Sequence, residues 1–182
     1  MRKTMLDAHD LLAAENFLAA EARIAASFER TEEAIAPLLR SMRATGRTTY
    51  VTDPERGAIW GHAFLKPPYA PSAEADWFIA WGLRFPDGGT GWDGADPPLP
   101  RTPHAIVVVG GHGAARPEPG SWAGTPLPPG WSMIGGEAAF LAAGIALREL
   151  PVESDALVAA LAQWTLSRIT ELKAALPGLA SG

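Results

Sequence analysis

The segment DWFIAWGLRF, residues 76–85, alternates so regularly that it predicts a β-strand with two unlike faces. Its odd positions are large and apolar: Trp77, Ile79, Trp81, Leu83 and Phe85. Its even positions are small in the middle and charged at the ends: Asp76, Phe78, Ala80, Gly82 and Arg84. We therefore expect helices to pack on the odd face and the even face to stay half open.

A helical region precedes this strand, over residues 5–44, where apolar side chains recur at helical spacing: Phe17, Ala20, Ile24 and Phe28. Thr31, followed by two glutamates, resembles a second N-cap, and Pro37 then falls inside the second segment. We expect either a long helix and a shorter one or a single bent helix, ending at Gly46.

Between residues 47 and 134 the hydrophobic period changes to two, which is typical of strands. A hairpin is predicted from TTYVT, DPERG and AIWGHAFL, with Gly57 at the end of its turn. One face of its second strand carries Trp60, His62 and Phe64. AIVVV (105–109) and WSMI (131–134) predict two further strands.

Two long loops, 86–103 and 110–130, flank the AIVVV strand. Within residues 86–130, 20 of 45 positions are glycine or proline, and structureless loops of this length are usually functional or mobile. Trp92 and Trp122 each lie in one loop, where an aromatic ring either anchors the loop to the domain or contacts a ligand. The bases of the loops are expected at opposite ends of the sheet.

The C-terminal part, residues 136–176, is predicted to be mainly helical. Residues 136–150 fit a helix followed by a short strand, with a longer strand through Ile145 to Leu150 as the alternative. Residues 154–176 form a clear amphipathic pattern that Pro177 and Gly178 are expected to end. The order of elements predicts one α+β domain over 1–182, a mainly antiparallel sheet of about four to five strands packed against N- and C-terminal helices.

Composition excludes several kinds of function. The formal charge is −5 and only three residues are lysine, so general nucleic-acid binding and membrane-surface binding are disfavoured. The absence of cysteine removes disulfides, thiolate metal sites and cysteine nucleophiles. Neither a signal peptide nor a stretch of about 18 apolar residues is present, so we expect a cytoplasmic protein. The Ala, Gly, Pro and Arg usage suggests a bacterium with a GC-rich genome.

The GGHG sequence after AIVVV does not meet the requirements of a phosphate loop. A dinucleotide loop needs a third glycine and a following helix, but residues 114–116 are AAR and a proline-rich segment comes next. An oxyanion hole would need a nucleophile, and no G-x-S-x-G motif accompanies Ser121 or Ser132. We therefore interpret the glycines as the end of a strand.

The spacing of the histidines and carboxylates does not favour a metal site. His104 and His112 bracket a strand whose length, about 26 Å, keeps them apart. A metal-dependent nuclease of the restriction-enzyme type would place E-x-K on the strand after Asp76, whereas the E-x-K of this chain, Glu171 to Lys173, lies near the C-terminus. No metal or other cofactor is predicted, and an inactive relative of that architecture stays an alternative.

The sequence thus favours a non-catalytic binding or regulatory protein that recognises a protein or small molecule through loop aromatics. Its binding candidates are these: Trp92, His112, Arg116 and Trp122. The alternative is a hydrolase-type enzyme with a cleft around His62, Asp76 and Arg84. The acidic N-terminal helix either covers the sheet of its own chain or pairs with a second copy, so a homodimer is also compatible with the sequence.

Overall fold

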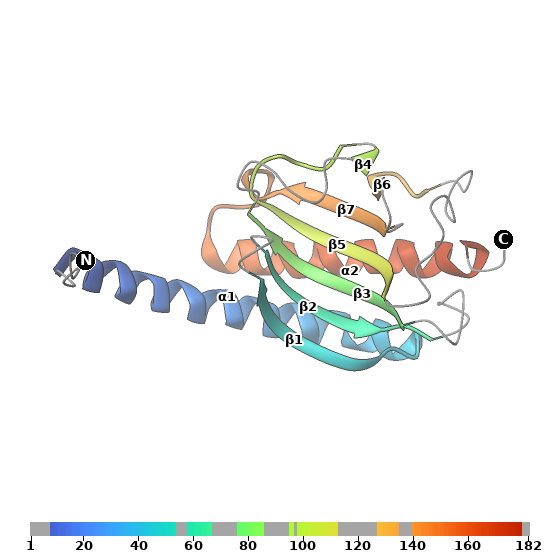
Figure 1. Ribbon diagram of the computed structural model, residues 1–182, viewed down its shortest axis with the longest axis horizontal. Helices are drawn as coiled ribbons and strands as arrows, with labels where there is room; N and C mark the ends of the chain where they lie inside the picture. The colour runs from blue at the N-terminus through green and yellow to red at the C-terminus, as the bar shows by residue number, and fades with distance from the viewer. Residues whose placement is uncertain are drawn as a thin grey trace, which may run out of the picture.

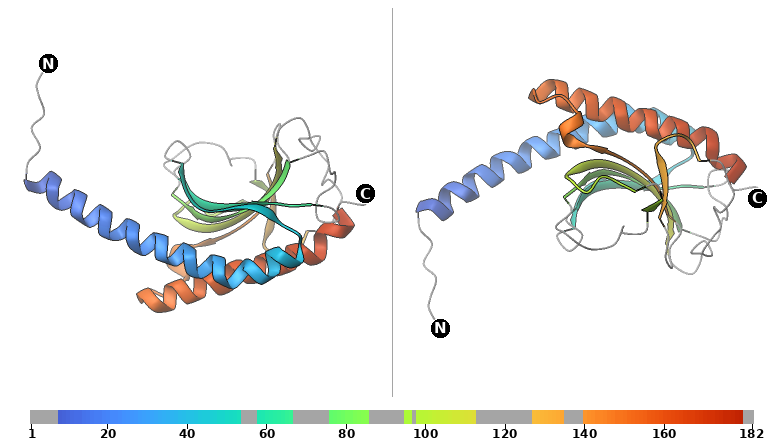
Figure 2. Two further views of the ribbon diagram at one scale, coloured as in Figure 1. Left: turned by 90° about the horizontal axis from the view of Figure 1, so that it is seen from below. Right: turned by 90° about the horizontal axis from the view of Figure 1, so that it is seen from above.

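Two long helices cover one face of an antiparallel sheet (Figures 1 and 2). The computed structural model describes residues 8–53, 58–66, 76–85, 95–96, 98–112, 127–134 and 140–179. The helices are α1 (Ala8–Ser41) and α2 (Ser154–Leu179), one before and one after the strands in the chain. The predicted α+β class and the antiparallel sheet are confirmed.

The sheet contains seven strands among the described residues, more than the roughly four to five expected. They are β1 (Thr45–Asp53), β2 (Ala58–Phe64), β3 (Asp76–Arg84), β4 (Ala95–Asp96), β5 (His104–His112), β6 (Trp131–Ile134) and β7 (Phe140–Ala146). Their spatial order is β1-β2-β3-β5-β7-β6-β4, with every neighbouring pair antiparallel. β4 was not expected, and β7 lies where a helix was preferred and a strand through Ile145 to Leu150 was the alternative.

β2 follows the predicted alternation, whereas the even face of β3, expected to stay half open, is largely buried, with Ala80 2% and Arg84 8% exposed. β1 and β2 form the expected hairpin, with Asp53 opposite Ala58. In β2 and just beyond it, Ala63 and Leu65 are fully buried in the core that includes helix residues, whereas His62 on the other face is half-buried. The odd residues of β3 from Trp77 to Leu83 also belong to this core.

α1 is continuous through both positions where a break was expected. Thr31 is not an N-cap: it is buried, and its hydroxyl donates to the carbonyl of Ser27 at 2.8 Å, as threonines inside helices do. Pro37 lies inside the helix on its exposed side, where water can bind the carbonyl that loses its amide partner. The helix ends before Gly46, because Arg43 adopts the left-handed conformation with φ 54°.

The helix expected from about residue 136 is wrong, because residues 140–146 form β7, followed by a short 3-10 turn, η2 (Leu147–Glu149). β7 is an inner strand between β5 and β6, and Leu141, Ala142 and Ala143 are buried on its two faces. A strand buried on both sides shows no polar alternation, so its alanines resemble a helix in the sequence.

β5 extends beyond AIVVV through both glycines to His112, so the second loop starts later than residue 110. Gly110 is required here by close packing, because a Cβ at this position would overlap the ring of Phe140 on β7. The glycines of GGHG that precede His112 thus belong to a strand, as interpreted from the sequence.

The main core lies between the helices and the odd residues of the central strands. α1 contributes Phe28, Ile35 and Leu39, with Met42 directly after its end, and α2 contributes Leu161, Ile169 and Leu172. α2 continues to Leu179, so Pro177 and Gly178 lie in its last turn and do not end it where expected. No helix within the described ranges is long and apolar enough to cross a membrane.

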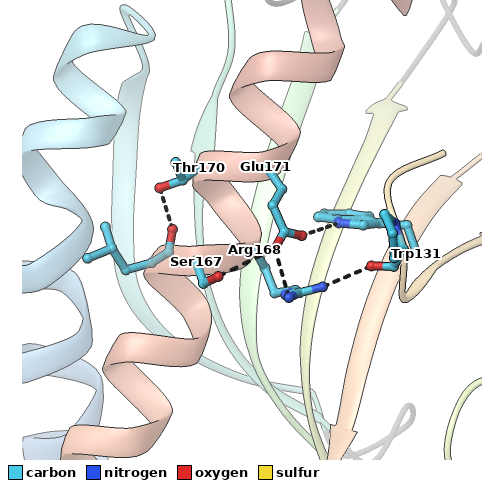
Figure 3. A network of polar contacts seen from close by, with 7 residues as sticks. Trp131, Ser167, Arg168, Thr170 and Glu171 are labelled. Atoms are coloured by element: carbon cyan, nitrogen blue, oxygen red, sulfur yellow. Dashed lines mark hydrogen bonds and ion pairs between the residues drawn. The ribbon is translucent and has the colours of Figure 1, made fainter. Parts of the chain in front are cut away.

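A polar network attaches the start of β6 to α2 (Figure 3). The indole Nε1 of Trp131 donates to Oε2 of Glu171 at 3.3 Å, and Arg168 donates to the carbonyl of Pro129 at 3.1 Å. Arg168 and Glu171 are themselves paired at 2.8 Å. The E-x-K carboxylate is therefore engaged with Trp131 and Arg168, and Lys173 instead donates to the hydroxyl of Ser41 at 2.7 Å.

Candidate functional site

The sheet face opposite the helices is the candidate binding surface, because no described helix covers it (Figure 2). Side chains on this face come from even positions of the central strands. The register aligns His62 of β2 with Ala80 of β3, and Ala80 with Val108 of β5. We call this surface the free face.

One half of the free face is closed by the chain itself. Ile106, Val108, Ile134 and Ala142 form a small second core there, and Leu99 and Phe140 pack against it. Leu99 and Pro100 also approach Gly144 of β7 so closely that a Cβ there would lie 3.1 Å from the Pro100 ring. This half of the surface is thus filled by apolar packing from within the chain.

The other half carries three rings in a row along β2. The ring centroids of Trp60 and His62 are 6.4 Å apart, and those of His62 and Phe64 are 5.6 Å apart in an edge-to-face arrangement. All three side chains are half-buried, and we call them the ring row. The indole Nε1 of Trp60 is shielded and has no hydrogen-bond partner within the part of the chain that the structure describes.

A buried basic pair lies at one end of the free face. Arg84 of β3 is opposite His104 of β5, and both side chains are buried. Nδ1 of His104 is 2.8 Å from the carbonyl oxygen of Thr102, and because a carbonyl only accepts, Nδ1 carries the proton. Burial lowers the pKa of His104, the bond to Thr102 opposes that effect, and the charge of Arg84 lowers the pKa further. The imidazole is therefore neutral at pH 7.

Of the predicted hydrolase cleft, His62 and Arg84 lie on the free-face side of β2 and β3, and the register separates the backbone positions of His62, Asp76 and Arg84 along the strands. His62 is opposite Ala80, which is four residues from Asp76 in one direction and four residues from Arg84 in the other. Four residues of strand span about 13 Å at roughly 3.3 Å each. The backbone does not bring the three positions to one point, and Arg84 has His104 as its cross-strand neighbour.

Only one of the four binding candidates predicted from the loops, His112, lies within the residues that the structure describes. Trp92, Arg116 and Trp122 lie outside the described residues. The backbone of His112 is the last position of β5, opposite Asp76, and so lies at the far end of that strand from His104. The second loop therefore starts at the opposite end of β5 from the segment that leads into His104, as the sequence analysis expected.

His104 was considered in the sequence only as a metal ligand, and its role beside Arg84 was missed. The parity of AIVVV places His104 on the same face as Ile106 and Val108, which is a readable signal. Its pairing with Arg84 is not readable, because it depends on how residues 86–103 connect the strands. Among the described residues, no three His, Asp or Glu side chains gather closely enough to hold a metal ion.

Comparison with other proteins supplies no additional assignment for these residues. No family model, curated protein or solved structure matches the chain. The function must therefore be argued from the free face itself.

Proposed function

We propose that this chain is a non-catalytic binding protein that holds a flat, largely apolar ligand on the ring row of the free face. The observation that carries the proposal is the row Trp60–His62–Phe64, with consecutive centroids 6.4 and 5.6 Å apart, on the sheet face that the helices leave uncovered. Aromatic side chains line ligand sites because they offer large contact area with little loss of rotamer freedom.

The contrast with the other half of the free face supports this proposal. Over β5 and β7 the apolar side chains are buried by Leu99 and Phe140, whereas the rings on β2 keep part of their surface exposed. The exposed parts of the three rings are apolar apart from the imidazole of His62. The ligand class is thus a planar, largely apolar molecule.

Binding of an anilinonaphthalenesulfonate dye, followed by its fluorescence, tests the proposal. Because the dye also reports loosened packing, each variant is first checked by circular dichroism and thermal unfolding. The wild-type chain is expected to bind the dye saturably, and His62→Ala and Trp60→Ala are expected to raise Kd about tenfold, since one lost ring contact is worth about 1.4 kcal/mol.

Tyr50→Ala is the matched control. Tyr50 is also a half-buried aromatic residue on a neighbouring strand, but it contacts Phe28 of α1, with ring centroids 5.7 Å apart. Its substitution is expected to leave the dye Kd unchanged. Absence of saturable binding, or equal Kd values for the His62 and Trp60 variants and the wild type, would contradict the proposal. Trp92→Ala and Trp122→Ala, measured in the same way, test whether the loop aromatics contribute to the same site.

A further inference from the structure

α1 is longer than the body that supports it. Its 34 residues span about 51 Å at roughly 1.5 Å per residue. α2 begins beside the middle of α1, where Arg30 lies 3.9 Å from Asp155, and both helices then run in the same direction until Ser41 meets Lys173. The N-terminal half of α1 extends beyond the sheet and beyond α2 (Figures 1 and 2).

Among the side chains that the structure describes in this projecting half, none is buried. Along the described side chains of α1, the first buried one is Ser27, and Leu12 is 59% exposed. A helix of about 12–15 residues without packing is marginal in water. The N-terminal helical region can cover the sheet of its own chain or contact another copy. Residues of the C-terminal half, such as Phe28, Ile35 and Leu39, cover the sheet, so the projecting half is available for contact with another copy.

An apolar groove of about 310 Å³ lies where the projecting half begins. Its lining includes Ala20, Ile24, Leu83, Val152, Leu157 and Val158. Val152 is 97% exposed, which is unusual for a large aliphatic side chain next to other apolar surface. Arg23 stands at the same groove and gives it a positive charge.

We infer that two copies of this chain form a dimer in which the projecting half of α1 from each copy packs into this groove of the other. The groove adjoins the root of the projecting half, so one two-fold axis near Ala20 satisfies both contacts at once. The charges are complementary, because residues 8–22 contain Asp10, Glu15 and Glu21 but no lysine or arginine, while Arg23 lines the groove. Leu12 supplies an apolar side chain on the projecting half.

The oligomeric state is measured by light scattering after size exclusion and by sedimentation equilibrium. The wild-type chain is expected to be a dimer. Leu12→Glu and Val152→Glu each place a charge in the apolar contact and are expected to raise the dissociation constant at least tenfold. Both positions are exposed in the single chain, so the fold is expected to persist by circular dichroism. Ala174→Glu, at an exposed position near the C-terminus of α2, is the matched control and leaves the dimer intact.

Cross-linking tests which surfaces meet. Because the chain contains no cysteine, Leu12→Cys and Val152→Cys can be made singly, mixed and oxidised without competing thiols. A covalent dimer that joins the two variants is expected, whereas Leu12→Cys mixed with Ala174→Cys gives none. A monomeric wild type would overturn the inference, and so would a dimer that both glutamate variants leave unchanged and that cross-links equally through position 174.

Discussion

His104 lies opposite Arg84 across β3 and β5, both buried on the free face, and donates its Nδ1 proton to the carbonyl of Thr102. A neutral imidazole beside a guanidinium is compatible with burial, whereas a second positive charge there would be repelled and poorly solvated. This pair therefore links the protonation of one residue to the stability of the sheet.

The first prediction concerns stability at acidic pH. The pKa of His104 is below its ordinary value of 6.5 in the folded chain, so the unfolded chain binds the proton first as the pH falls. Well above pH 6.5, His104 is neutral in both the folded and the unfolded chain, so it adds no pH dependence to the free energy of unfolding. Below it, the free energy falls by up to about 1.4 kcal/mol per pH unit, until the folded-state pKa is reached.

Urea unfolding between pH 5 and pH 8, compared for the wild type and His104→Asn, measures this effect. Asparagine can keep the hydrogen bond to Thr102 but does not titrate in this range. The wild type is expected to lose more stability than the variant on acidification. An identical pH dependence in the two proteins would show that His104 is not the residue responsible.

The second prediction concerns two glycines of the free face whose neighbours differ in their ability to move. A Cβ at Gly82 would overlap the backbone carbonyl of Ile59, whereas a Cβ at Gly110 would overlap the Phe140 ring. Gly110→Ala is expected to cost about 1–3 kcal/mol, as overpacking does, and Gly82→Ala is expected to cost more. Chemical denaturation of both variants gives the comparison.

The double variant Gly110→Ala/Phe140→Ala separates the two cases. Removing the ring makes room for the new methyl group, so the double variant is expected to be less destabilised than the sum of the single variants. No side-chain removal relieves Gly82→Ala, because the overlapping atom is in the backbone. Strict additivity at Gly110 and Phe140 would contradict the packing described for β5 and β7.

The third prediction concerns the end of α1. Arg43 has a left-handed backbone, φ 54°, which costs a residue with a Cβ about 1 kcal/mol relative to glycine. Arg43→Gly is therefore expected to raise the free energy of unfolding by about 0.5–1 kcal/mol. Arg40→Gly, in the last turn of the helix proper, is the control and is expected to lower it by a similar amount. Thermal unfolding of the two variants should shift Tm in opposite directions.

Sequence periodicity predicted β2, β3 and α2, whose large apolar residues recur on the face that belongs to the main core. In β3 the even residues Ala80 and Gly82 are buried as well, but they are small, so the contrast between the two faces is still visible in the sequence. β7 was predicted as a helix because Leu141, Ala142 and Ala143, buried on its two faces, show no such contrast. The local preference for a break at Thr31 is outweighed by the burial of Phe28 and Ile35 on either side, and that at Pro37 by the burial of Ile35 and Leu39.

The sequence predicted which residues of the candidate site share a face of a strand, but not which residues of neighbouring strands lie opposite each other. The sequence placed Trp60, His62 and Phe64 on one face, and the structure keeps them there in contact. Strand pairing across loops of irregular length aligns Arg84 with His104. The same pairing places His62 four residues along the strand from both Asp76 and Arg84. Such long-range register cannot be read from the period of a single strand.

The fourth prediction concerns the attachment of β6 to α2 (Figure 3). Trp131 is buried, and its indole donates to Glu171, which also pairs with Arg168. Glu171→Ala is expected to cost about 1–3 kcal/mol, because it leaves the buried indole N–H without an acceptor. Glu171→Gln keeps an acceptor for Trp131 and loses only the ion pair with a half-buried Arg168, so it is expected to cost less than about 1 kcal/mol.

A double-mutant cycle with Trp131→Phe isolates the hydrogen bond, since phenylalanine fills much of the same space without the N–H group. Once that donor is absent, Glu171→Ala is expected to cost about 0.5–1.5 kcal/mol less than it does in the wild type. Urea unfolding of the four proteins provides the coupling energy. If the cost of Glu171→Ala is the same in both backgrounds, the carboxylate acts through Arg168 and the carbonyl of Pro129, and the bond to Trp131 does not stabilise the fold.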